Sequence, residues 1–395
     1  MSAAVRRPSL ARRLLVGVAQ WIAIVAITLL IGELAARFLF GVRPLETEAL
    51  VWDPHPRWGW FHRPNASALF VKPGFSQQVE INSRGLRERE IPYEKPEGVQ
   101  RVLVIGDSSV VSFEVPPEAA FPRVAEDLLR SRGYAVEFVN GGVRGFGTDQ
   151  TLLFLKEEGL RYQPDLVLYK WTDNDPDDNA TIHRPFRRFG KPWFALEDGD
   201  RLVLKGVPVP DYPYEANLRV DANGELKELP VGLRSLATLY FRDVVVCHSA
   251  FATGLLKVAL AMPGLTRSLV RMGSYQDRED VDSSLDRNAP LFRVTAAMVR
   301  EMERVANEAG AQFRLIGVGD KWGRALVEVT GVGTLDEIER YKAGIQPGVE
   351  LHAKYDPHWN EAGHLLYGTA LADALEAAGL VRRDGSPEPE RQPDR

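Results

Sequence analysis

The sequence predicts an α/β fold, a doubly wound parallel sheet with an inserted cap and an N-terminal transmembrane helix, and three observations lead to this prediction. Four short runs rich in Val, Leu and Ile are typical of buried parallel strands: 101–105, 135–140, 165–171 and 312–319. Segments with helical spacing separate these runs, and such an alternation of strands and helices indicates a parallel sheet. A long apolar stretch near the N-terminus matches the length of a membrane span.

The composition excludes several classes of protein. The 395 residues suffice for one large domain or two ordinary ones, and 45% hydrophobic with 26% charged residues is typical of a globular chain. The net charge of −5 and the isoelectric point of about 5.9 argue against a nucleic-acid partner, which normally requires a basic excess. The single cysteine, Cys247, allows no intrachain disulfide and lies in the apolar run VVVCHSA, where we expect a buried structural thiol.

The N-terminal region has the features of a membrane anchor. Residues 1–13 contain four arginines and no acidic residue, and residues 14–40 are predicted to be a transmembrane signal anchor. Its first 19 residues include one strongly polar side chain, Gln20, and are about long enough to cross a hydrocarbon core of ~30 Å. The basic flank predicts a cytoplasmic N-terminus, with everything after about residue 40 on the outer side. The alternative is a cleaved signal peptide, with the two alanines at 35–36 as the small residues near a cut.

Residues 41–100 are rich in proline and aromatic residues, and we predict that they form a membrane-proximal collar. The run FVKPGFSQQVEIN predicts a short strand or two, and Gly85 is expected at a turn. Two interpretations apply to Arg84 and Arg87. They pack within the collar, which we favour, or they reach a functional site as anion contacts.

Residues 101–380 form the predicted α/β core, with residues 180–290 as an insertion. Helical spacing follows the first strand over 118–133 and stops at a glycine, as helices commonly do. A glycine-rich loop at 141–150 follows the second strand. The last helix is expected to begin after Asn360, a residue type that favours the N-cap position.

The insertion breaks the alternation of strands and helices. The sequence KPWFALEDGDRLVLKGVPVP predicts a β-hairpin around Asp198 and Gly199. Residues 233–262 are apolar but carry charged side chains, so we predict one or two amphipathic helices that cover the core or the bilayer surface. Residues 276–288 are a solvated charge run, and the charged, proline-rich tail 381–395 is predicted to be disordered.

Polar segments follow the predicted strands and loops at one edge of the sheet: Gly106-Asp107-Ser108, Asn140 to Gly145, Asn174-Asp175 and Asp356-Pro357-His358. In a doubly wound sheet these segments converge on the edge where open α/β folds bind their ligands. The sequence therefore brings together a hydroxyl, an imidazole, a carboxylate, a side-chain amide and a glycine backbone.

Acyl transfer needs this set of groups. Ser108 is the candidate nucleophile, His358 the base that takes its proton, and Asp356 the acceptor for the other imidazole N–H. The tetrahedral intermediate carries an oxyanion, and the N–H groups of Ser108 and Gly145 with the amide of Asn174 are the candidate donors. Bulk at Gly145 would hold its backbone away from the substrate.

Each of these residues also has a purely structural interpretation. Asn140 and Asn174 are typical turn residues that bond to their own backbone, and the segment from Asp356 to His358 is compatible with a plain loop. The acidic stretch TDNDPDDN invites a Ca²⁺ site, but it lacks the central Gly and distal Glu of the EF-hand pattern. We therefore expect no metal and no cofactor. His364, on the last helix, is expected to be a core histidine.

In this order the four segments resemble the sequence blocks of the SGNH (GDSL-type) hydrolase superfamily, here IGDSS, NGGVRGFGTDQ, WTDNDPDDN and DPHWNEAGH. The resemblance covers roughly residues 100–180 and 310–380. It implies a flavodoxin-like three-layer sandwich. It also implies that Ser108 is the nucleophile and that Gly145 and Asn174 are oxyanion donors. His358 would be the base, and Asp356 would complete the triad.

The chain departs from the family pattern at two places. Thr172 stands where the third block usually has Gly, and the last block is Asp-x-His instead of the commoner Asp-x-x-His. The shorter spacing is similar to a bacterial envelope branch that includes alginate O-acetyltransferase-like proteins. This resemblance implies a single-pass protein of the bacterial inner membrane, with its catalytic domain on the periplasmic or extracellular side.

Three functions remain open at the level of the sequence. The first is a membrane-anchored serine esterase for an acyl ester, with O-acetyl groups of envelope or exported polysaccharide as candidate substrates. The second is an O-acyltransferase that uses the same triad and passes the acyl group to a sugar hydroxyl. The third is a non-catalytic envelope module that binds glycan. The expected partners are an acyl ester and the membrane, and not nucleic acid.

Overall fold

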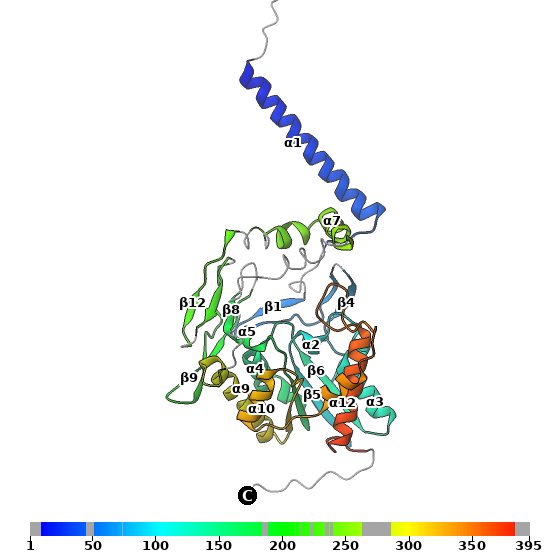
Figure 1. The fold of residues 1–395 in the computed structure, drawn as a ribbon, viewed down its shortest axis with the longest axis vertical. Coiled ribbons are helices and arrows are strands. Elements are labelled where there is room, and N and C mark those ends of the chain that lie inside the picture. Colours follow the sequence, from blue (N-terminus) through cyan, green and yellow to red (C-terminus); the bar gives the residue numbers. More distant parts are fainter. Residues whose placement is uncertain are drawn as a thin grey trace, which may run out of the picture.

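The computed structural model describes residues 9–44, 51–72, 74–183, 189–213, 215–221, 224–233, 237, 240–262 and 286–383 (Figure 1). Arg6 and Arg7, most of the charge run at 276–288 and the tail from 384 lie outside the described residues. The long helix α1 projects from one end of a body that contains the other described elements (Figure 1).

The core is a parallel sheet of four strands in the order β13-β7-β5-β6. These strands are β5 (Gln100–Gly106), β6 (Val136–Gly142), β7 (Leu166–Lys170) and β13 (Gln312–Ile316). They match the four predicted runs, because a run of Val, Leu and Ile that is apolar on both faces is stable only between two layers of helices. Every residue of β5 and β7 is buried.

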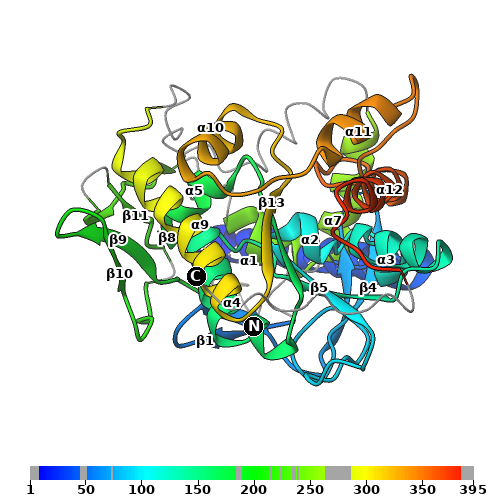
Figure 2. The ribbon, with the colours of Figure 1, turned by 90° about the horizontal axis from the view of Figure 1, so that it is seen from below.

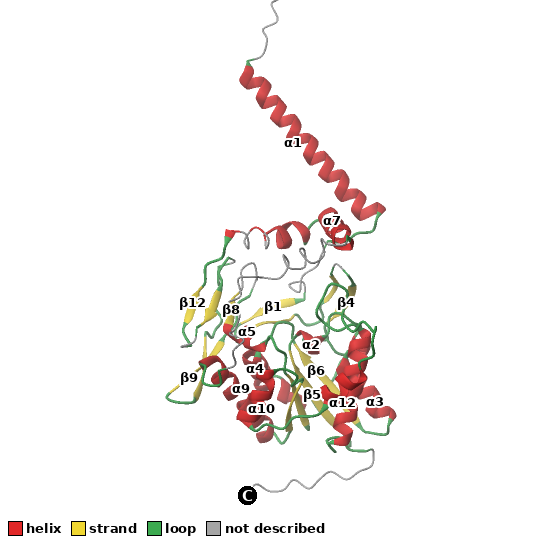
Figure 3. Ribbon diagram, viewed as in Figure 1, coloured by secondary structure: helices red, strands yellow, loops and turns green. Residues whose placement is uncertain are grey.

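Helices cover both faces of this sheet, as Figure 2 shows end-on and Figure 3 by element type. One face packs against α4 (Thr148–Glu157) and α9 (Pro290–Glu308), and the other against α3 (Phe121–Ser131) and α12 (Glu361–Ala377). Successive β5 residues alternate between these layers: Leu103 and Ile105 face α4 and α9, and Val102 and Val104 face α3 and α12. The predicted three-layer, doubly wound core is therefore confirmed.

The strand order determines where the sheet can hold a ligand. The chain runs from β5 outward to β6 and then returns to β7 on the opposite side of β5. The order thus reverses beside β5, and the loops that leave β5 and β7 diverge at their carboxyl ends. This is the place where open α/β sheets leave a crevice.

The predicted collar contains two antiparallel hairpins: β1 (Trp52–His55) with β2 (Gly59–His62), and β3 (Ser67–Val71) with β4 (Ser76–Glu80). Gly85 has φ +81°, the left-handed conformation expected of a turn glycine. Arg87 is buried and donates to the backbone carbonyls of Val111, Ser112 and Val115, while Arg84 lies over the ring of Tyr93. The packing interpretation of both arginines agrees with these contacts.

The insertion holds small sheets and an apolar helical segment. The helix α5 (Asp175–Ala180) leads into it, and its own elements are β8 (Thr181–His183), β9 (Trp193–Glu197), β10 (Arg201–Lys205), β11 (Leu218–Val220), β12 (Leu226–Glu228), the π-helix η5 (Phe241–Val246) and α7 (Ala250–Ala261). The hairpin β9–β10 turns at Asp198 and Gly199, both with positive φ, as predicted. The apolar run 233–262 is helical in η5 and α7.

Short helices complete the core between the main elements. They are the 3-10 helices η3 (Pro117–Ala119) and η4 (Gly159–Tyr162), and the α-helices α2 (Ser108–Val111), α10 (Lys321–Thr330) and α11 (Glu337–Gly344). Asn360 caps α12, and its side chain accepts a hydrogen bond from the Gly363 N–H. His364 is buried on α12 beside Phe121, as expected for a core histidine.

The N-terminal helix α1 spans Leu10–Leu34 and continues as the π-helix η1 (Ala35–Leu39). Together they form a helix that is long and apolar enough to cross a membrane, by length and composition. No part of its most apolar 18-residue window is buried against the rest of the described chain. Such a helix is compatible with a membrane anchor and with a signal sequence, the two alternatives that the sequence left open.

Candidate active site

Ser108 lies at the point where β5 ends and α2 begins. Asp107 caps α2 with its side chain, which accepts from the Ser109 N–H at 2.9 Å. Gly106 makes this turn possible, because it has φ +154° and a Cβ there would lie 2.9 Å from Val110 Cγ2. As the first residue of α2, Ser108 has an N–H without an acceptor inside the helix.

Asn140 lies on the neighbouring strand β6 and holds α2 in place. Its amide donates to the Val110 carbonyl at 2.8 Å, and its side-chain oxygen accepts from the Gly142 N–H at 3.1 Å. The backbone approach is close, since a Cβ on Gly142 would lie 2.4 Å from the Val111 nitrogen. Asn140 therefore supports the nucleophile helix by bonds to the backbone, in agreement with its structural interpretation.

His358 lies in the loop before the last helix, α12, and its imidazole contacts Ser108. The distance from His358 Nε2 to Ser108 Oγ is 2.8 Å, although 250 positions separate the two residues in the chain. The loop that carries His358 is held by hydrogen bonds of its own: the Ala353 N–H donates to the His358 carbonyl and the Asp356 N–H to the Ala353 carbonyl. The imidazole is thus placed beside the hydroxyl by a loop that is braced internally.

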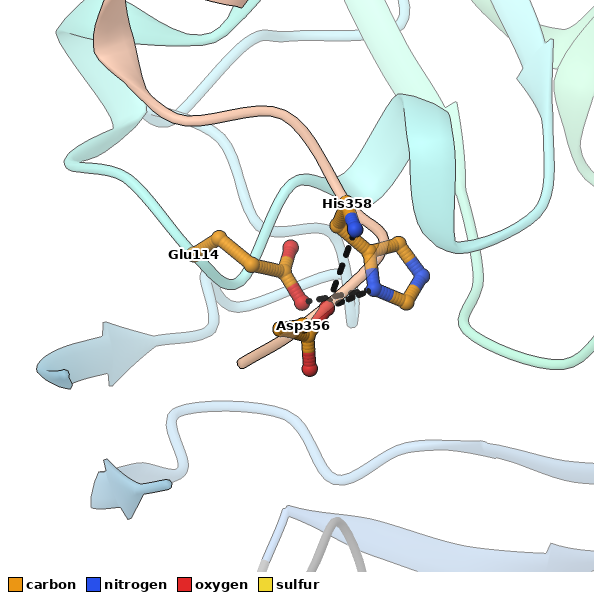
Figure 4. A group of neighbouring side chains, drawn as sticks. All are labelled: Glu114, Asp356 and His358. Carbon is orange, nitrogen blue, oxygen red and sulfur yellow. Dashed lines mark hydrogen bonds and ion pairs between the residues drawn. The ribbon is translucent and has the colours of Figure 1, made fainter. Parts of the chain in front are cut away.

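Asp356 contacts the other side of the imidazole (Figure 4). Its Oδ1 bonds to His358 Nδ1 and accepts from the His358 backbone N–H at 3.0 Å. Burial by itself raises the pKa of Asp356, but the hydrogen bonds and charge of His358 outweigh it and lower this pKa to about 2. An ionised Asp356 keeps the proton of His358 on Nδ1, so Nε2 can accept the Ser108 hydroxyl proton.

Glu114 is a second carboxylate beside the same imidazole, and the sequence analysis missed it (Figure 4). Its Oε1 lies 3.4 Å from His358 Nδ1 and accepts from Arg144 at 2.6 Å. The Glu114 side chain is fully buried, and its Oε2 has no hydrogen-bond partner among the described residues. The signal in the sequence was slight, a single acid in the apolar run VVSFEV.

The remaining candidate residues lie in the loops that leave the two strands beside β5. Gly145 follows β6 and has φ +79°, and the Trp60 indole donates to the preceding carbonyl, that of Arg144, at 3.2 Å. Asn174 follows β7 at the start of α5, where its amide donates to Asp178 at 2.6 Å. The structure therefore places both residues at the same edge of the sheet as Ser108, and joins Ser108, His358 and Asp356 by direct contacts.

Thr172, at the position where the SGNH sequence block that the chain resembles usually has Gly, links two of these loops. Its hydroxyl donates to Asp107 at 3.3 Å, and its N–H donates to Asp175 at 2.9 Å. Asp175 also accepts from the Tyr169 hydroxyl, and burial, followed by the charge of Asp107, raises the pKa of Asp175 well above its usual value. The hydroxyl of Thr172 thus adds a tie between the β7 loop and the nucleophile turn.

The acidic groups near the site have protein partners. Glu114, Asp356 and His358 offer ligand atoms within 4.8 Å of one another, a spacing that a metal ion could bridge. However, Glu114 Oε1 accepts from Arg144, and His358 Nδ1 is bonded to Asp356 Oδ1. In the stretch after β7, Asp177 pairs with Arg219 at 2.8 Å. These contacts favour a hydrogen-bonded relay over a metal cage.

Comparisons with known proteins give one partial relative and a group of solved structures. No family model matches the chain. A segment of 76 residues is 33% identical to an arylesterase of Vibrio mimicus, and the match covers 19% of this chain and 38% of the arylesterase. The chain therefore matches less than half the length of that relative.

Several solved structures match the chain over about 70% of its length. TesA covers 70% of this chain and 99% of its own at 11% identity and a TM-score of 0.35. A putative lipolytic protein of the G-D-S-L family from Desulfitobacterium hafniense has the same identity and coverage with a TM-score of 0.36. A catalytic mutant of Axe2, an acetylxylan esterase from Geobacillus stearothermophilus, covers 70% of this chain and 94% of its own at 11% identity, with a TM-score of 0.31.

Proposed function

We propose that this chain is a membrane-anchored serine ester hydrolase of the SGNH type. The observation that carries the proposal is the contact of 2.8 Å between Ser108 Oγ and His358 Nε2, with Asp356 on the opposite ring nitrogen. A hydroxyl, an imidazole and a carboxylate in this order are the groups that activate serine for attack on an acyl carbon. The sequence resemblance to SGNH hydrolases assigns the same roles to the same residues.

In the proposed first step, Ser108 Oγ attacks the ester carbonyl carbon while His358 Nε2 takes the hydroxyl proton. The imidazolium is stabilised by ionised Asp356, and the tetrahedral intermediate collapses when His358 returns the proton to the leaving alcohol. Water then attacks the acyl-Ser108 ester, again losing its proton to His358. The carboxylic acid departs and the Ser108 hydroxyl is regenerated.

The proposed oxyanion donors come from three loops. The N–H of Ser108 is free of intrahelical bonds because it starts α2, and Gly145 leaves its backbone uncovered by a side chain. The Asn174 amide carries two N–H groups, of which one binds Asp178. Donors fixed in this way need no rearrangement as charge develops, and one such donor typically contributes ~10²–10³ in rate.

The proposal places the chain in the bacterial inner membrane through α1, with the hydrolase domain on the periplasmic or extracellular side. The exposed apolar surface of α1 and the arginines before it support this orientation. We further propose O-acetyl groups of envelope or exported polysaccharide as the substrate. The name of Axe2, an acetylxylan esterase, gives this choice a precedent among proteins that the chain resembles in fold.

The test compares Ser108→Ala with Ser131→Ala, which removes a hydroxyl from an exposed position on α3. We expect Ser108→Ala to reduce hydrolysis of p-nitrophenyl acetate by at least ~10³-fold and to abolish labelling by a fluorophosphonate, with an unchanged melting temperature. Ser131→Ala should behave as the wild type. Labelling or turnover that survives in Ser108→Ala would remove Ser108 from the mechanism.

The fate of the acyl group can be followed in the same assay. Acetylated oligosaccharide is supplied with and without an unacetylated acceptor, and free acetate and newly acetylated sugar are quantified. The proposal expects free acetate as the main product in both cases. Acetyl transfer that outpaces hydrolysis would show that a sugar hydroxyl takes the place of water.

A further inference from the structure

An exposed apolar surface lies outside the proposed active site, on the side of the domain that faces α1. We define it as the α7 face, made of the exposed apolar residues of the segment 240–262: Tyr240, Phe241, Val244, Val245, Leu255, Val258 and Met262. We propose that the α7 face lies in the interfacial layer of the membrane that α1 spans, so that the domain is held on the bilayer at two places. This inference rests on the proposed membrane anchoring and is independent of the proposed chemistry.

The exposed residues of α7 form one stripe. Leu255 and Val258 are 55% and 57% exposed, and their spacing of three residues puts them on the same side of the helix. Met262, the C-cap residue of α7, is 50% exposed at the end of the helix. Other exposed apolar residues of the described core, such as Leu365 on α12, do not form such a run. Single exposed residues are ordinary, whereas a contiguous apolar surface indicates a nonpolar partner.

The opposite side of α7 is attached to the domain. Leu256 and Ala252 pack against Val71 of β3 and Val246 of η5. The Thr253 hydroxyl donates to the Val246 carbonyl at 2.9 Å. The stripe is therefore held outward by a fixed helix.

A carboxylate at the end of α1 binds the start of α7. Glu33 accepts from the Ser249 hydroxyl at 2.8 Å and from the N–H groups of Ala250 and Phe251 at 2.9 Å each. Because the N-terminus of a helix carries partial positive charge and unpaired N–H groups, a carboxylate there is a favourable cap. Arg37 closes the junction by pairing with Glu33 at 2.6 Å and donating to the His248 carbonyl at 3.2 Å.

The two helices also approach closely beside this cap. The Phe251 ring lies against Gly32, where a Cβ would be 3.0 Å from the ring. On the other side of the junction, a Cβ on Gly254 would be 3.8 Å from Val42. Glycine at position 32 therefore lets the Phe251 ring of α7 pack directly on the backbone of α1.

These contacts fix the depth of α7 relative to the span. Glu33 directly follows the apolar stretch that ends at Gly32, so the capped end of α7 lies at the level where the hydrocarbon core ends. Figure 1 shows α7 at the foot of α1, between α1 and the rest of the domain. An apolar face at that level is the feature of helices that lie in the membrane interface.

The arrangement also sets which edge of the core sheet faces the membrane. In Figure 1, α2 lies on the side of the sheet that is nearer to α7 and α1. Since α2 begins at Ser108, the carboxyl edge of the sheet is the membrane-proximal edge. A second attachment through the α7 face would hold this edge in a constant orientation to the bilayer, because a single spanning helix is free to tilt in lipid and the domain attached to it would tilt as well.

The experiment uses the full chain in nanodiscs of phosphatidylcholine and phosphatidylglycerol. Cys247 is the single cysteine, so Cys247→Ala gives a background for one nitroxide label at a time. Labels are attached through Leu255→Cys and Val258→Cys on the α7 face, Ile22→Cys on α1, and Leu365→Cys, a 58% exposed control on α12. Accessibility of each label to oxygen, which concentrates in lipid, and to a water-soluble nickel chelate is measured by electron paramagnetic resonance.

We expect the oxygen-to-nickel accessibility ratio at both α7 labels to exceed that at Leu365→Cys by at least about threefold, and to stay below that at Ile22→Cys. A ratio on α7 equal to that of Leu365→Cys overturns the inference. Low accessibility to both reagents also overturns it, because the face would then be covered by protein. If the label at Ile22→Cys is accessible to the nickel chelate, α1 does not span the bilayer and the proposed membrane anchoring is wrong. This outcome differs from one in which only the α7 labels contradict the inference.

Discussion

The charge of Glu114 gives the most specific prediction about the proposed mechanism. Glu114→Gln removes this charge and keeps a side chain of the same size with an oxygen that can still accept from Arg144. The carboxylate lies 3.4 Å from His358 Nδ1, on the ring that becomes positively charged when Ser108 is deprotonated. The variant therefore tests whether Glu114 assists the base as a second carboxylate beside Asp356.

The structure sets the size of the expected effect. At an effective dielectric constant of about 20, a full negative charge at 3.4 Å stabilises the imidazolium by about 5 kcal/mol. Arg144, whose Nη1 is 2.6 Å from the same oxygen, is present in both proteins, so its repulsion does not enter the difference between them. The loss of about 5 kcal/mol corresponds to a roughly 10³–10⁴-fold change in rate.

We therefore expect Glu114→Gln to lower kcat for p-nitrophenyl acetate by roughly 10³–10⁴-fold, with little change in KM. Because the imidazolium loses stabilisation, the acidic limb of the pH–rate profile should move to lower pH. A role limited to packing would leave the profile in place. Glu118→Gln, which removes the same charge from an exposed position nearby, is the matched control.

Glu114 does not assist the base if Glu114→Gln keeps kcat within twofold of the wild type and leaves the acidic limb unmoved. The melting temperature of each variant is measured alongside, so that a loss of fold is separated from a loss of charge. If the activity falls but the acidic limb stays in place, Glu114 supports the loop and has no electrostatic part in the proposed relay.

Two further predictions concern the turn at Gly145 and the stability of the domain in acid. Gly145→Ala and the control Gly133→Ala both place a side chain at positive φ, +79° and +84°, and each should cost about 1–2 kcal/mol of stability. Only Gly145→Ala should lower kcat, by ~10²-fold, because of these two glycines only Gly145 is a proposed oxyanion donor. Equal activities of the two variants would exclude this role. His62 is fully buried, and burial lowers its pKa to about 4, so below pH 6.5 the unfolded chain takes up a proton that the folded chain does not. His62→Gln should therefore reduce the slope of the free energy of unfolding against pH by about 1.4 kcal/mol per pH unit between pH 6.5 and 4. The slope is measured in urea titrations of the detergent-solubilised protein. An unchanged slope would contradict a neutral buried His62.

The sequence was sufficient for the core because its two central strands, β5 and β7, are buried along their whole length. Their runs are largely apolar without alternation, which restricts them to a covered parallel sheet. The positions of the polar segments after these strands then follow from the topology. For this reason the contact between Ser108 and His358 was predictable across 250 positions.

The collar was harder to predict because its hairpins depend on tertiary contacts. In the hairpin of β1 and β2, Pro54 pairs with Trp60. The two strands are stabilised by contacts between indole rings such as those of Trp52 and Trp60, whose centroids are 5.7 Å apart. Proline and glycine in WDPHPRWGW argue against strands when each run is considered alone. Contacts between side chains outweighed these local preferences.

Glu114 was missed for a related reason. It follows α2 after Ser112, which has φ +58°, and this turn is held by the buried Arg87, which donates to the carbonyls of Val111, Ser112 and Val115. The direction of the Glu114 side chain thus depends on an arginine from the collar. A motif search along the chain contains no information about that contact.

The separation of Ser108 and His358 along the chain has a consequence for biosynthesis. A ribosome releases α1 first, then the hydroxyl, and the imidazole only 250 residues later. The growing polypeptide therefore passes through most of its synthesis with an unactivated serine. Under the proposed function, ester cleavage begins only when the C-terminal helix has docked, so neither a nascent chain nor a product truncated before residue 358 can attack acyl groups on its way to the cell surface.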